Sequence, residues 1–343
     1  MFVIRLDANH QKGMGHLFRM LHVAENLTRN KDSILFAGRL NSASQDILRE
    51  KGYPFSAFGP GCDENEIIEK IFTDQSGIAL WIYDILDTES LWIEAIRGHK
   101  VRVLCMDDNG AGVKLADQVI LTLPTKYLPL TERDPSGRIL QGIEYMILCD
   151  NAHRLKKART ILRDQKIRLG ICMGGSDTYG SSIFLATVLE TVRDRLEEVH
   201  FFLGPSFEHE QRLFEQLADV SYVYQCHSFV QNLPVELDAL DAVISGGGMT
   251  LFEAASMGLP ILAFANELFE LANIQYLAER GACALLGCIH DRAFDQVQFR
   301  LKRLLCSEVQ LTRMAAKARR VVVQDGVRRI AEVIQYSAFP AYS

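Results

Sequence analysis

The sequence lacks several features that would place the protein in other classes. No run of about 18 uncharged apolar residues occurs, so we expect no transmembrane helix. The segment from Met1 to Asp7 carries no basic stretch followed by a long apolar one, which a secretory signal peptide requires. The apolar content of 48% in 343 residues is nevertheless sufficient for two globular domains. We therefore expect a cytoplasmic protein.

Clustered positive charge and paired cysteines are also missing. The formal net charge is −6 and no basic stripe occurs, so nucleic acid is a poor candidate partner. The 8 cysteines form no CxxC pair, and several lie in apolar runs such as Val103 to Met106. This placement favours reduced, buried thiols over disulfides or a zinc site. We expect neither a metal nor a cofactor, and the sequence leaves the oligomeric state open.

Short apolar runs alternate with amphipathic stretches along nearly the whole chain, a pattern typical of βα units around a parallel sheet. In the first half, strands are expected at residues 2–7, 33–37, 79–84, 101–106 and 118–121. Turn formers, including Pro129 and Pro135, interrupt the alternation over residues 122–139. A helix near residues 151–165 follows, and helices also fill residues 291–336. Between these helices, strands are expected at residues 168–173, 200–203, 222–225, 242–245 and 261–264.

Two blocks of βα units joined by an irregular connector predict an α/β protein. We expect two Rossmann-like, doubly wound domains that face each other across a cleft. Residues 1–150 would form the N-terminal domain, and residues 151–343 would form a C-terminal domain that includes the last helices. In open α/β sheets, ligands bind beyond the carboxyl ends of the strands. The loops that follow the strands are therefore the places to search for a site.

The loop after the first expected strand closes with Gly13, Gly15 and His16, just before an amphipathic helix. The glycines permit positive φ and close approach of a ligand. A helix N-terminus disfavours the imidazolium form, which leaves His16 able to accept a proton. The same residues could equally turn the chain and begin the helix without any chemical role, because GxG patterns are weak signals.

Two further glycine loops follow strands of the second block, at Gly174 to Ser176 and at Gly246 to Thr250. Backbone N–H groups of such loops, supported by a helix dipole, can hold a diphosphate without a lysine. Neither loop has the form of a P-loop or of a GxGxxG dinucleotide site, which weakens ATPase and dehydrogenase hypotheses. Glu253, one turn into the next helix, could bind ribose hydroxyls or reach back to Thr250 in a capping box.

Taken in order along the chain, these motifs resemble a known family. It is the UDP-2,4-diacetamido-2,4,6-trideoxy-β-L-altropyranose hydrolase family of pseudaminic acid biosynthesis, within the GT-B superfamily. The resemblance covers nearly the whole chain and implies a GT-B-like fold. The matching motifs are Arg5-x-Asp7, Gly13-x-Gly15-His16-x-x-Arg19, Asp107-Asp108, Ile171 to Asp177, and Gly246 to Pro260.

The resemblance implies a role for each matching residue. His16 would be the general base, Asp7, Arg19 and Asp84 would line the sugar side, and Gly13 and Gly15 would form the loop beside the substrate. Asp84 could orient the attacking water or bind a sugar hydroxyl and Asp7 could position His16, but both could equally be strand-end caps. The implied reaction is hydrolysis of a UDP-linked deoxy-amino sugar, with inverting attack of water at the anomeric carbon. Uridine diphosphate would be held by Gly174, Gly175, Ser176, Gly247, Gly248, Met249, Thr250, Glu253 and Asn266.

The sequence also departs from the family pattern. Ile85 and Leu86 follow Asp84 where the family usually has His-Tyr, Gly180 lies where a polar residue is common, and Glu267 replaces a Gln. These changes affect the sugar side more than the nucleotide side, so a UDP-sugar is a firmer expectation than the identity of the sugar. Two alternatives stay open: a GT-B glycosyltransferase that activates an acceptor hydroxyl in place of water, and a non-catalytic nucleotide-sugar binder.

Overall fold

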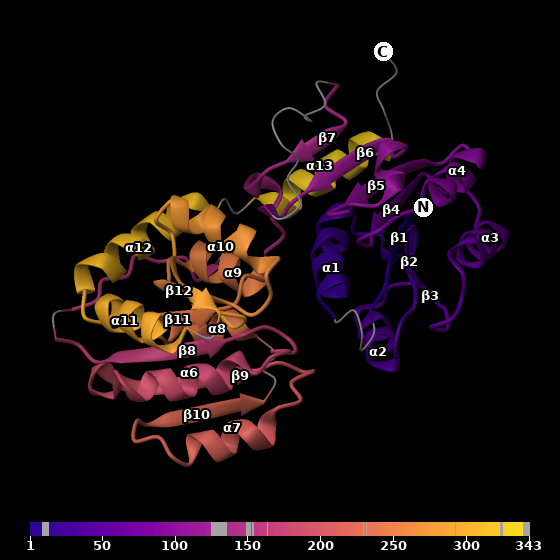
Figure 1. Cartoon of the computed structure of the whole chain (residues 1–343). Helices are drawn as coiled ribbons and strands as arrows, with labels where there is room; N and C mark the ends of the chain where they lie inside the picture. Colours follow the sequence, from indigo (N-terminus) through magenta and orange to yellow (C-terminus); the bar gives the residue numbers. More distant parts are fainter. Residues whose placement is uncertain are drawn as a thin grey trace. The chain divides into compact units, whose positions relative to one another are not determined.

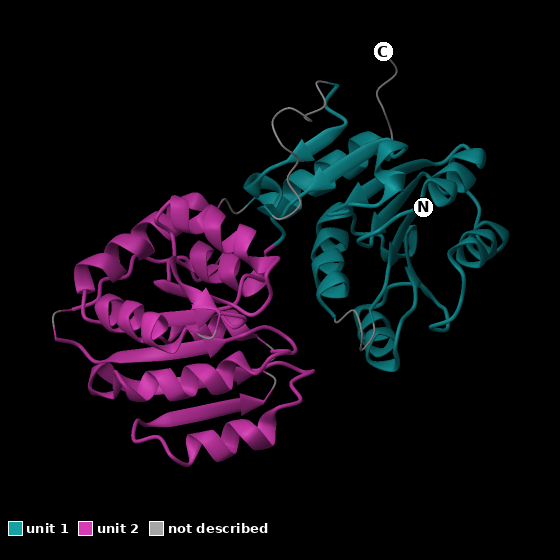
Figure 2. Ribbon diagram, viewed as in Figure 1, with its two compact units in different colours: residues 1–147, 325–343 teal, residues 148–324 magenta. Residues whose placement is uncertain are grey.

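The computed structural model contains two compact units (Figures 1 and 2). Unit 1 comprises Met1–Ile147 and Asp325–Ser343, and unit 2 comprises Leu148–Gln324. Gly13, Pro129 and Pro135, which the sequence analysis singled out, lie outside the residues that the structure describes. The described residues are 1–8, 14–124, 136–148, 152, 154–162, 164–228, 230, 232–291, 293–322 and 325–338.

Unit 1 is built on a parallel sheet that, over its described residues, has seven strands in the order β3-β2-β1-β4-β5-β6-β7. The strands are β1 (Phe2–Leu6), β2 (Ile34–Gly38), β3 (Phe55–Ala57), β4 (Leu80–Asp84), β5 (Arg102–Met106), β6 (Gln118–Leu121) and β7 (Ile139–Gln141). The helices are α1 (Gly15–Leu27), α2 (Ser42–Lys51), α3 (Glu64–Asp74), α4 (Ser90–Gly98) and α13 (Gly326–Ala338). The five strands expected here are confirmed to within one residue at each end. The short, partly exposed edge strands β3 and β7 were not predicted, because they form no continuous apolar run.

Helices cover both faces of this sheet, which explains why its central strands are apolar throughout. Ile4 and Ile82 point to the face covered by α1 and α13. Val3 and Trp81, one residue away on the same strands, point to the face covered by α3 and α4. Both faces are therefore fully buried, and polar side chains gather where the strands end.

The last helix belongs to unit 1, which differs from the expected placement of residues 151–343 in one domain. Ile330, Ala331 and Ile334 of α13 are buried in the same apolar cluster as α1. Burying each isoleucine contributes about 1.5–3 kcal/mol. Gly326 begins the helix against the Met146 carbonyl, where an added Cβ would lie only 2.0 Å from the oxygen. Packing against unit 1, and not position in the sequence, decides where this helix lies.

Unit 2 has a second parallel sheet, whose described part is ordered β10-β9-β8-β11-β12-β13 over six strands. This is the strand order of the Rossmann fold. The strands are β8 (Ile167–Cys172), β9 (Leu196–Leu203), β10 (Tyr224–Ser228), β11 (Ala242–Ser245), β12 (Ile261–Ala265) and β13 (Ala284–Cys288). The helices are α6 (Ser181–Glu190), α7 (Glu210–Leu217), α8 (Leu233–Asp238), α9 (Met249–Met257), α10 (Glu270–Glu279), α11 (Phe294–Leu305) and α12 (Glu308–Val321). Strand β13 was not predicted, and β9 begins at Leu196, earlier than expected.

The helix expected near residues 151–165 does not extend across that segment, because residues 156–162 lie outside helices and strands. Polar contacts hold this extended segment against the surface of unit 2. Lys157 Nζ and Arg159 Nη2 pair with the Asp238 carboxylate at 2.8 and 2.7 Å. The Ile161 N–H donates to Thr312 Oγ1 of α12 at 3.1 Å. Lys157 and Arg159, which belong to the segment expected to be helical, thus make tertiary ion pairs instead.

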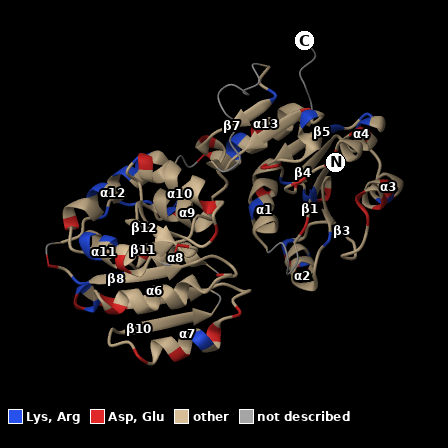
Figure 3. Ribbon diagram, in the orientation of Figure 1, with Lys and Arg blue, Asp and Glu red and all other residues tan. Residues whose placement is uncertain are grey.

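Lys and Arg residues are interspersed with Asp and Glu residues along the helices of both units (Figure 3). Within the described part of the chain, no helix is both long and apolar enough to cross a bilayer. The described residues also contain no group of three or more His, Cys, Asp or Glu side chains arranged to hold a metal ion.

Candidate active site

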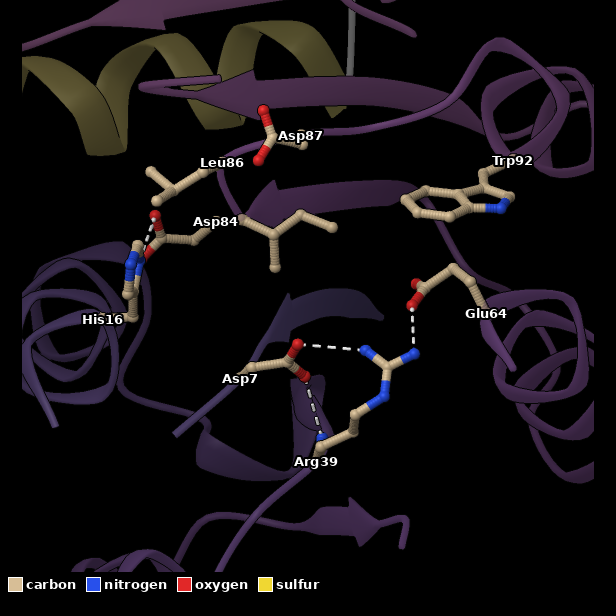
Figure 4. Close-up of a pocket in the computed structure, with 9 residues that line it drawn as sticks. Asp7, His16, Arg39, Glu64, Asp84, Leu86, Asp87 and Trp92 are labelled. Carbon is tan, nitrogen blue, oxygen red and sulfur yellow. Dashed lines mark hydrogen bonds and ion pairs between the residues drawn. The ribbon is translucent and has the colours of Figure 1, made fainter. Parts of the chain in front are cut away.

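The unit 1 sheet carries a pocket of about 210 Å³ at the carboxyl ends of its strands (Figure 4). His16 and Asp84 lie at one end of it, and Glu64 and Trp92 lie at the other. The lining residues come from the ends of β1, β2 and β4 and from α1, α3 and α4; they are Asp7, His16, Arg39, Glu64, Asp84, Ile85, Leu86, Asp87 and Trp92. The structure therefore brings together the three residues expected to act in catalysis.

A buried ion-pair network fixes the Asp84 carboxylate. Arg19 Nε donates to Asp84 Oδ2 at 2.8 Å, and Arg19 Nη2 pairs with Asp84 Oδ1. Arg19 Nη1 reaches Asp107 Oδ2 at 2.7 Å. Asp107 has a left-handed backbone with φ of 49°, and its carboxylate also accepts hydrogen bonds from the Thr122 N–H and hydroxyl. Arg19, expected to line the substrate, is instead enclosed between these two carboxylates.

His16 lies in the first turn of α1, directly beside this network. Its buried Nδ1 lies 3.1 Å from Asp84 Oδ1, close enough to form an ion pair when His16 is protonated. Nδ1 therefore faces the carboxylate, and Nε2 is the ring nitrogen left to take a proton from a substrate. A carboxylate in this position stabilises the imidazolium that such a proton transfer creates.

The Asp84 side chain is fully buried and stays ionised. Burial alone would raise the pKa of its carboxyl group, but the Arg19 guanidinium and then His16 outweigh burial and hold that pKa well below its ordinary value. The network Arg19, Asp84 and Asp107 carries one positive and two negative charges. A proton taken up by His16 would bring it to neutrality.

Asp7 takes part in a second network, on the floor of the pocket. Its Oδ1 accepts from Arg5 Nη1 at 2.6 Å and from the Arg39 backbone N–H at 3.1 Å, and its Oδ2 accepts from Arg39 Nη1 at 3.0 Å. Arg5 is fully buried and also binds both Glu64 oxygens, at 2.8 and 2.6 Å. Asp7 thus positions Arg39 and not His16, which corrects the role suggested for it from the sequence.

Four lining residues were not identified from the sequence, namely Arg39, Glu64, Asp87 and Trp92. Arg39 directly follows β2 and Glu64 begins α3, so the rule that sites follow strand ends could have found both. Neither residue belongs to a glycine loop, which is the local signal that marked the other candidate residues. Ile85 and Leu86, the departures from the family pattern, form an apolar part of the wall.

Unit 2 has its own pocket of about 210 Å³, where the two expected nucleotide loops meet. Gly174 and Gly175, after β8, and Thr250, in the first turn of α9, all line it. The remaining lining residues are Cys172, Phe202, Leu203, Gly204, Pro205, Val230 and Leu233. Gly204 packs against this loop, since an added Cβ there would lie 2.3 Å from the Gly175 oxygen. The pocket is thus mainly apolar, with open backbone along one side.

The α9 helix begins at Met249 with Gly248 as its N-cap, and no side chain caps it. Thr250 lies inside the helix and is not its N-cap, so it does not hold the position that the capping box considered for Glu253 requires. Gly248 is exposed and has open space around its Cα. Glu253 is partly exposed, one turn further along. A helix start with glycine at the N-cap can bind an anion through its first backbone amides.

The other expected nucleotide residues differ in accessibility. Ser176 is exposed, and its hydroxyl lies 3.1 Å from that of Thr178. Asn266 is buried instead, and its Oδ1 accepts from the Ser181 hydroxyl at 2.7 Å, so this side chain links β12 to α6. Gly180, a departure from the family pattern, has φ of 70° at the N-cap of α6, a conformation that favours glycine.

Comparison with curated proteins finds distant relatives, and no family model matches the chain. The chain is 23% identical to the spore coat polysaccharide biosynthesis protein SpsG of Bacillus subtilis over 96% of each sequence. It is 24% identical to the UDP-N-acetylglucosamine–N-acetylmuramyl-(pentapeptide) pyrophosphoryl-undecaprenol N-acetylglucosamine transferase of Azotobacter vinelandii, over 68% of this chain and 64% of that protein. An uncharacterized Methanocaldococcus jannaschii protein, MJ1062, is 27% identical over 79% of this chain and 57% of its own length.

Solved structures identify the fold. MurG of Acinetobacter baumannii matches with a TM-score of 0.69 at 16% identity, covering 97% of this chain and 99% of that one. The calicheamicin glycosyltransferase CalG4 matches with a TM-score of 0.66 at 11% identity, over 100% and 99%. The predicted α/β class with two Rossmann-like domains is thereby confirmed. The chain has the GT-B fold, and the solved structures that share this fold include glycosyltransferases.

Proposed function

We propose that the protein is a GT-B enzyme that transfers a sugar from a UDP-sugar to a hydroxyl group of an acceptor. The observation that carries this proposal is His16 at the rim of the unit 1 pocket, with Nδ1 3.1 Å from the buried Asp84 carboxylate. Such a pair is the arrangement that general-base catalysis requires. The similarity to an N-acetylglucosamine transferase and to a polysaccharide biosynthesis protein supports transfer of a sugar.

In this reaction His16 Nε2 removes the proton of the acceptor hydroxyl as its oxygen attacks the anomeric carbon. The bond between that carbon and the diphosphate oxygen breaks, and UDP leaves with the bonding electron pair. Asp84 stabilises the resulting imidazolium, and the configuration at the anomeric carbon inverts. Arg19 acts through Asp84 by keeping its carboxylate ionised and in place.

Unit 2 would supply the nucleotide site. Its pocket combines apolar walls, which suit a flat base, with the open backbone of the Gly174–Gly175 loop. The uncapped N-terminus of α9 would stabilise the charge that develops on the leaving diphosphate. Glu253, one turn into α9, would accept hydrogen bonds from the ribose hydroxyls. Solved structures of the same fold include one in complex with UDP and glucose, which supports this choice of ligand.

Hydrolysis, the reaction implied by the sequence motifs, uses the same residues with water in place of the acceptor. It stays a prediction, and one experiment separates it from transfer. UDP release from UDP-N-acetylglucosamine is measured with and without a panel of hydroxyl-bearing glycan acceptors. Transfer predicts release that depends on the acceptor, together with a glycosylated product. Rapid release without acceptor, with ¹⁸O from labelled water at C1 of the sugar, would establish hydrolysis instead.

The role of His16 is tested with His16→Asn, and His22→Asn on the same helix serves as a matched control. We expect His16→Asn to lower turnover by roughly 10² to 10⁴, the usual contribution of a positioned base. Its UDP affinity should stay within about twofold of the wild-type value, because the nucleotide loops belong to unit 2. Wild-type turnover in His16→Asn would refute the proposed base, whichever nucleophile is used.

A further inference from the structure

The glycine loop after β11 is held by a carboxylate from the start of the next helix. Glu270 is the first residue of α10, and it accepts a hydrogen bond from the Gly247 N–H. Its Oε2 also accepts from the Asn266 N–H at 2.8 Å and from the Glu267 N–H at 3.4 Å. One side chain therefore collects three backbone amides from the ends of two neighbouring strands.

A second side chain of α10, Asn273, holds the same loop, and we call Glu270 and Asn273 together the clamp. Asn273 Nδ2 donates to the Gly247 carbonyl oxygen at 2.8 Å, so Glu270 and Asn273, one turn apart, hold both sides of the same residue. An added Cβ at Gly247 would lie 2.5 Å from the Glu270 Cβ and 2.7 Å from its backbone oxygen. The glycine at this position is thus required by the approach of α10, and the loop has one defined geometry.

The clamp places the partly buried Glu270 carboxylate next to the expected diphosphate site. Gly247 is adjacent to Gly248, the uncapped N-cap of α9, whose next turn contains Thr250 of the unit 2 pocket. Burial raises the pKa of the Glu270 carboxyl group, and the nearby charge of Glu267 raises it further. The hydrogen bonds from the three backbone amides lower this pKa but do not outweigh burial, so the pKa of Glu270 lies above its ordinary value. An anion arriving at α9 would disfavour the ionised carboxylate further.

We propose that Glu270 is a positioning residue of the nucleotide loop and that binding of UDP is coupled to uptake of one proton by its carboxyl group. The proton comes from solvent and is held on a Glu270 oxygen while UDP is bound. This inference rests on the proposed function, because it takes UDP as the ligand of unit 2.

The sign of the coupling follows from linkage. Because the bound-state pKa of Glu270 lies above its free-state pKa, UDP affinity is highest below the free-state pKa. It falls as the pH rises through the interval between the two values and is constant above the bound-state pKa. A rise of one pKa unit on binding corresponds to a tenfold loss of affinity across that interval. Glu270→Gln keeps the shape and an acceptor oxygen but cannot ionise.

The test is calorimetric titration of the full chain with UDP from pH 5 to 8, in buffers of different ionisation enthalpy. The wild type should take up more protons than the titration of free UDP accounts for. Glu270→Gln should lose this excess and bind UDP roughly tenfold more tightly at pH 8. Glu279→Gln, an exposed charge at the far end of α10, is the control and should behave like the wild type.

A second variant, Asn273→Ala, loosens the clamp but keeps the carboxylate. It should bind UDP more weakly than the wild type and retain the excess proton uptake. If UDP binds with the same proton uptake in wild type and Glu270→Gln, the inference fails and the proposed function stands. If the wild type does not bind UDP, both fail. Should Glu270→Gln not fold, wild-type uptake equal to that of free UDP alone would still refute the coupling.

Discussion

Replacing Asp84 by Asn tests whether the buried network at His16 stabilises unit 1 as strongly as its geometry indicates. The substitution would leave the Arg19 guanidinium with Asp107 as its one remaining carboxylate within that network. Removing one partner of a buried ion pair costs about 3–5 kcal/mol, and the remaining pair places the expected loss near 3 kcal/mol. For a unit of this size that is a fall in melting temperature of roughly 6–12 °C.

The chain provides a selective probe for this measurement. It contains 2 tryptophans, Trp81 and Trp92, and both belong to unit 1. Urea unfolding followed by tryptophan fluorescence therefore reports on the unit that contains Asp84, independently of unit 2. UDP affinity should be unchanged, while turnover should fall by roughly 10² to 10⁴ as the base loses its carboxylate.

The pH dependence gives the same test a second readout. The folded-state pKa of Asp84 is depressed below its unfolded value of about 3.9, so its stabilisation is present above pH 4 and is lost as the pH falls below that value. Asp84→Asn should lack this part of the acid dependence. In a double-mutant cycle, Arg19→Met should cost roughly 1–3 kcal/mol less in the Asp84→Asn background. Wild-type stability in Asp84→Asn, or strict additivity, would refute the reasoning.

Two further predictions concern unit 2. Glu253→Ala should weaken UDP binding, because its carboxylate is expected to hold the ribose; a loss of unfolding free energy near ~1 kcal/mol without ligand, with unchanged UDP affinity, would show that Glu253 serves the helix start instead. Gly247→Ala should lower the melting temperature in circular dichroism, because its Cβ would lie 2.5 Å from that of Glu270. Gly248→Ala has open space and φ of −83° and should melt like the wild type; equal melting of the two variants would show that α10 does not constrain the loop.

The sequence alone predicted the repeating βα units and most of their strands. Alternation of apolar runs with amphipathic stretches predicts parallel strands, since a strand covered on both faces must be apolar along its length. It located Asp7 and Asp84 because they lie at strand ends, and His16 because it begins the helix that follows the first strand. It located Gly174, Gly175 and the start of α9 for the same reason, since loop and helix-start signals are local.

Only the tertiary structure decided how those side chains are used. Arg19 and Asp84 are far apart in sequence, and nothing local shows that the arginine is enclosed by two carboxylates. The amphipathic pattern of α13 specifies a buried face but not which sheet covers it, and packing against α1 assigns the helix to unit 1. Gly247 looked like a ligand-binding glycine, yet the contact with Glu270 requires it. Long-range packing sets these partners, and a pattern read along the chain carries no information about it.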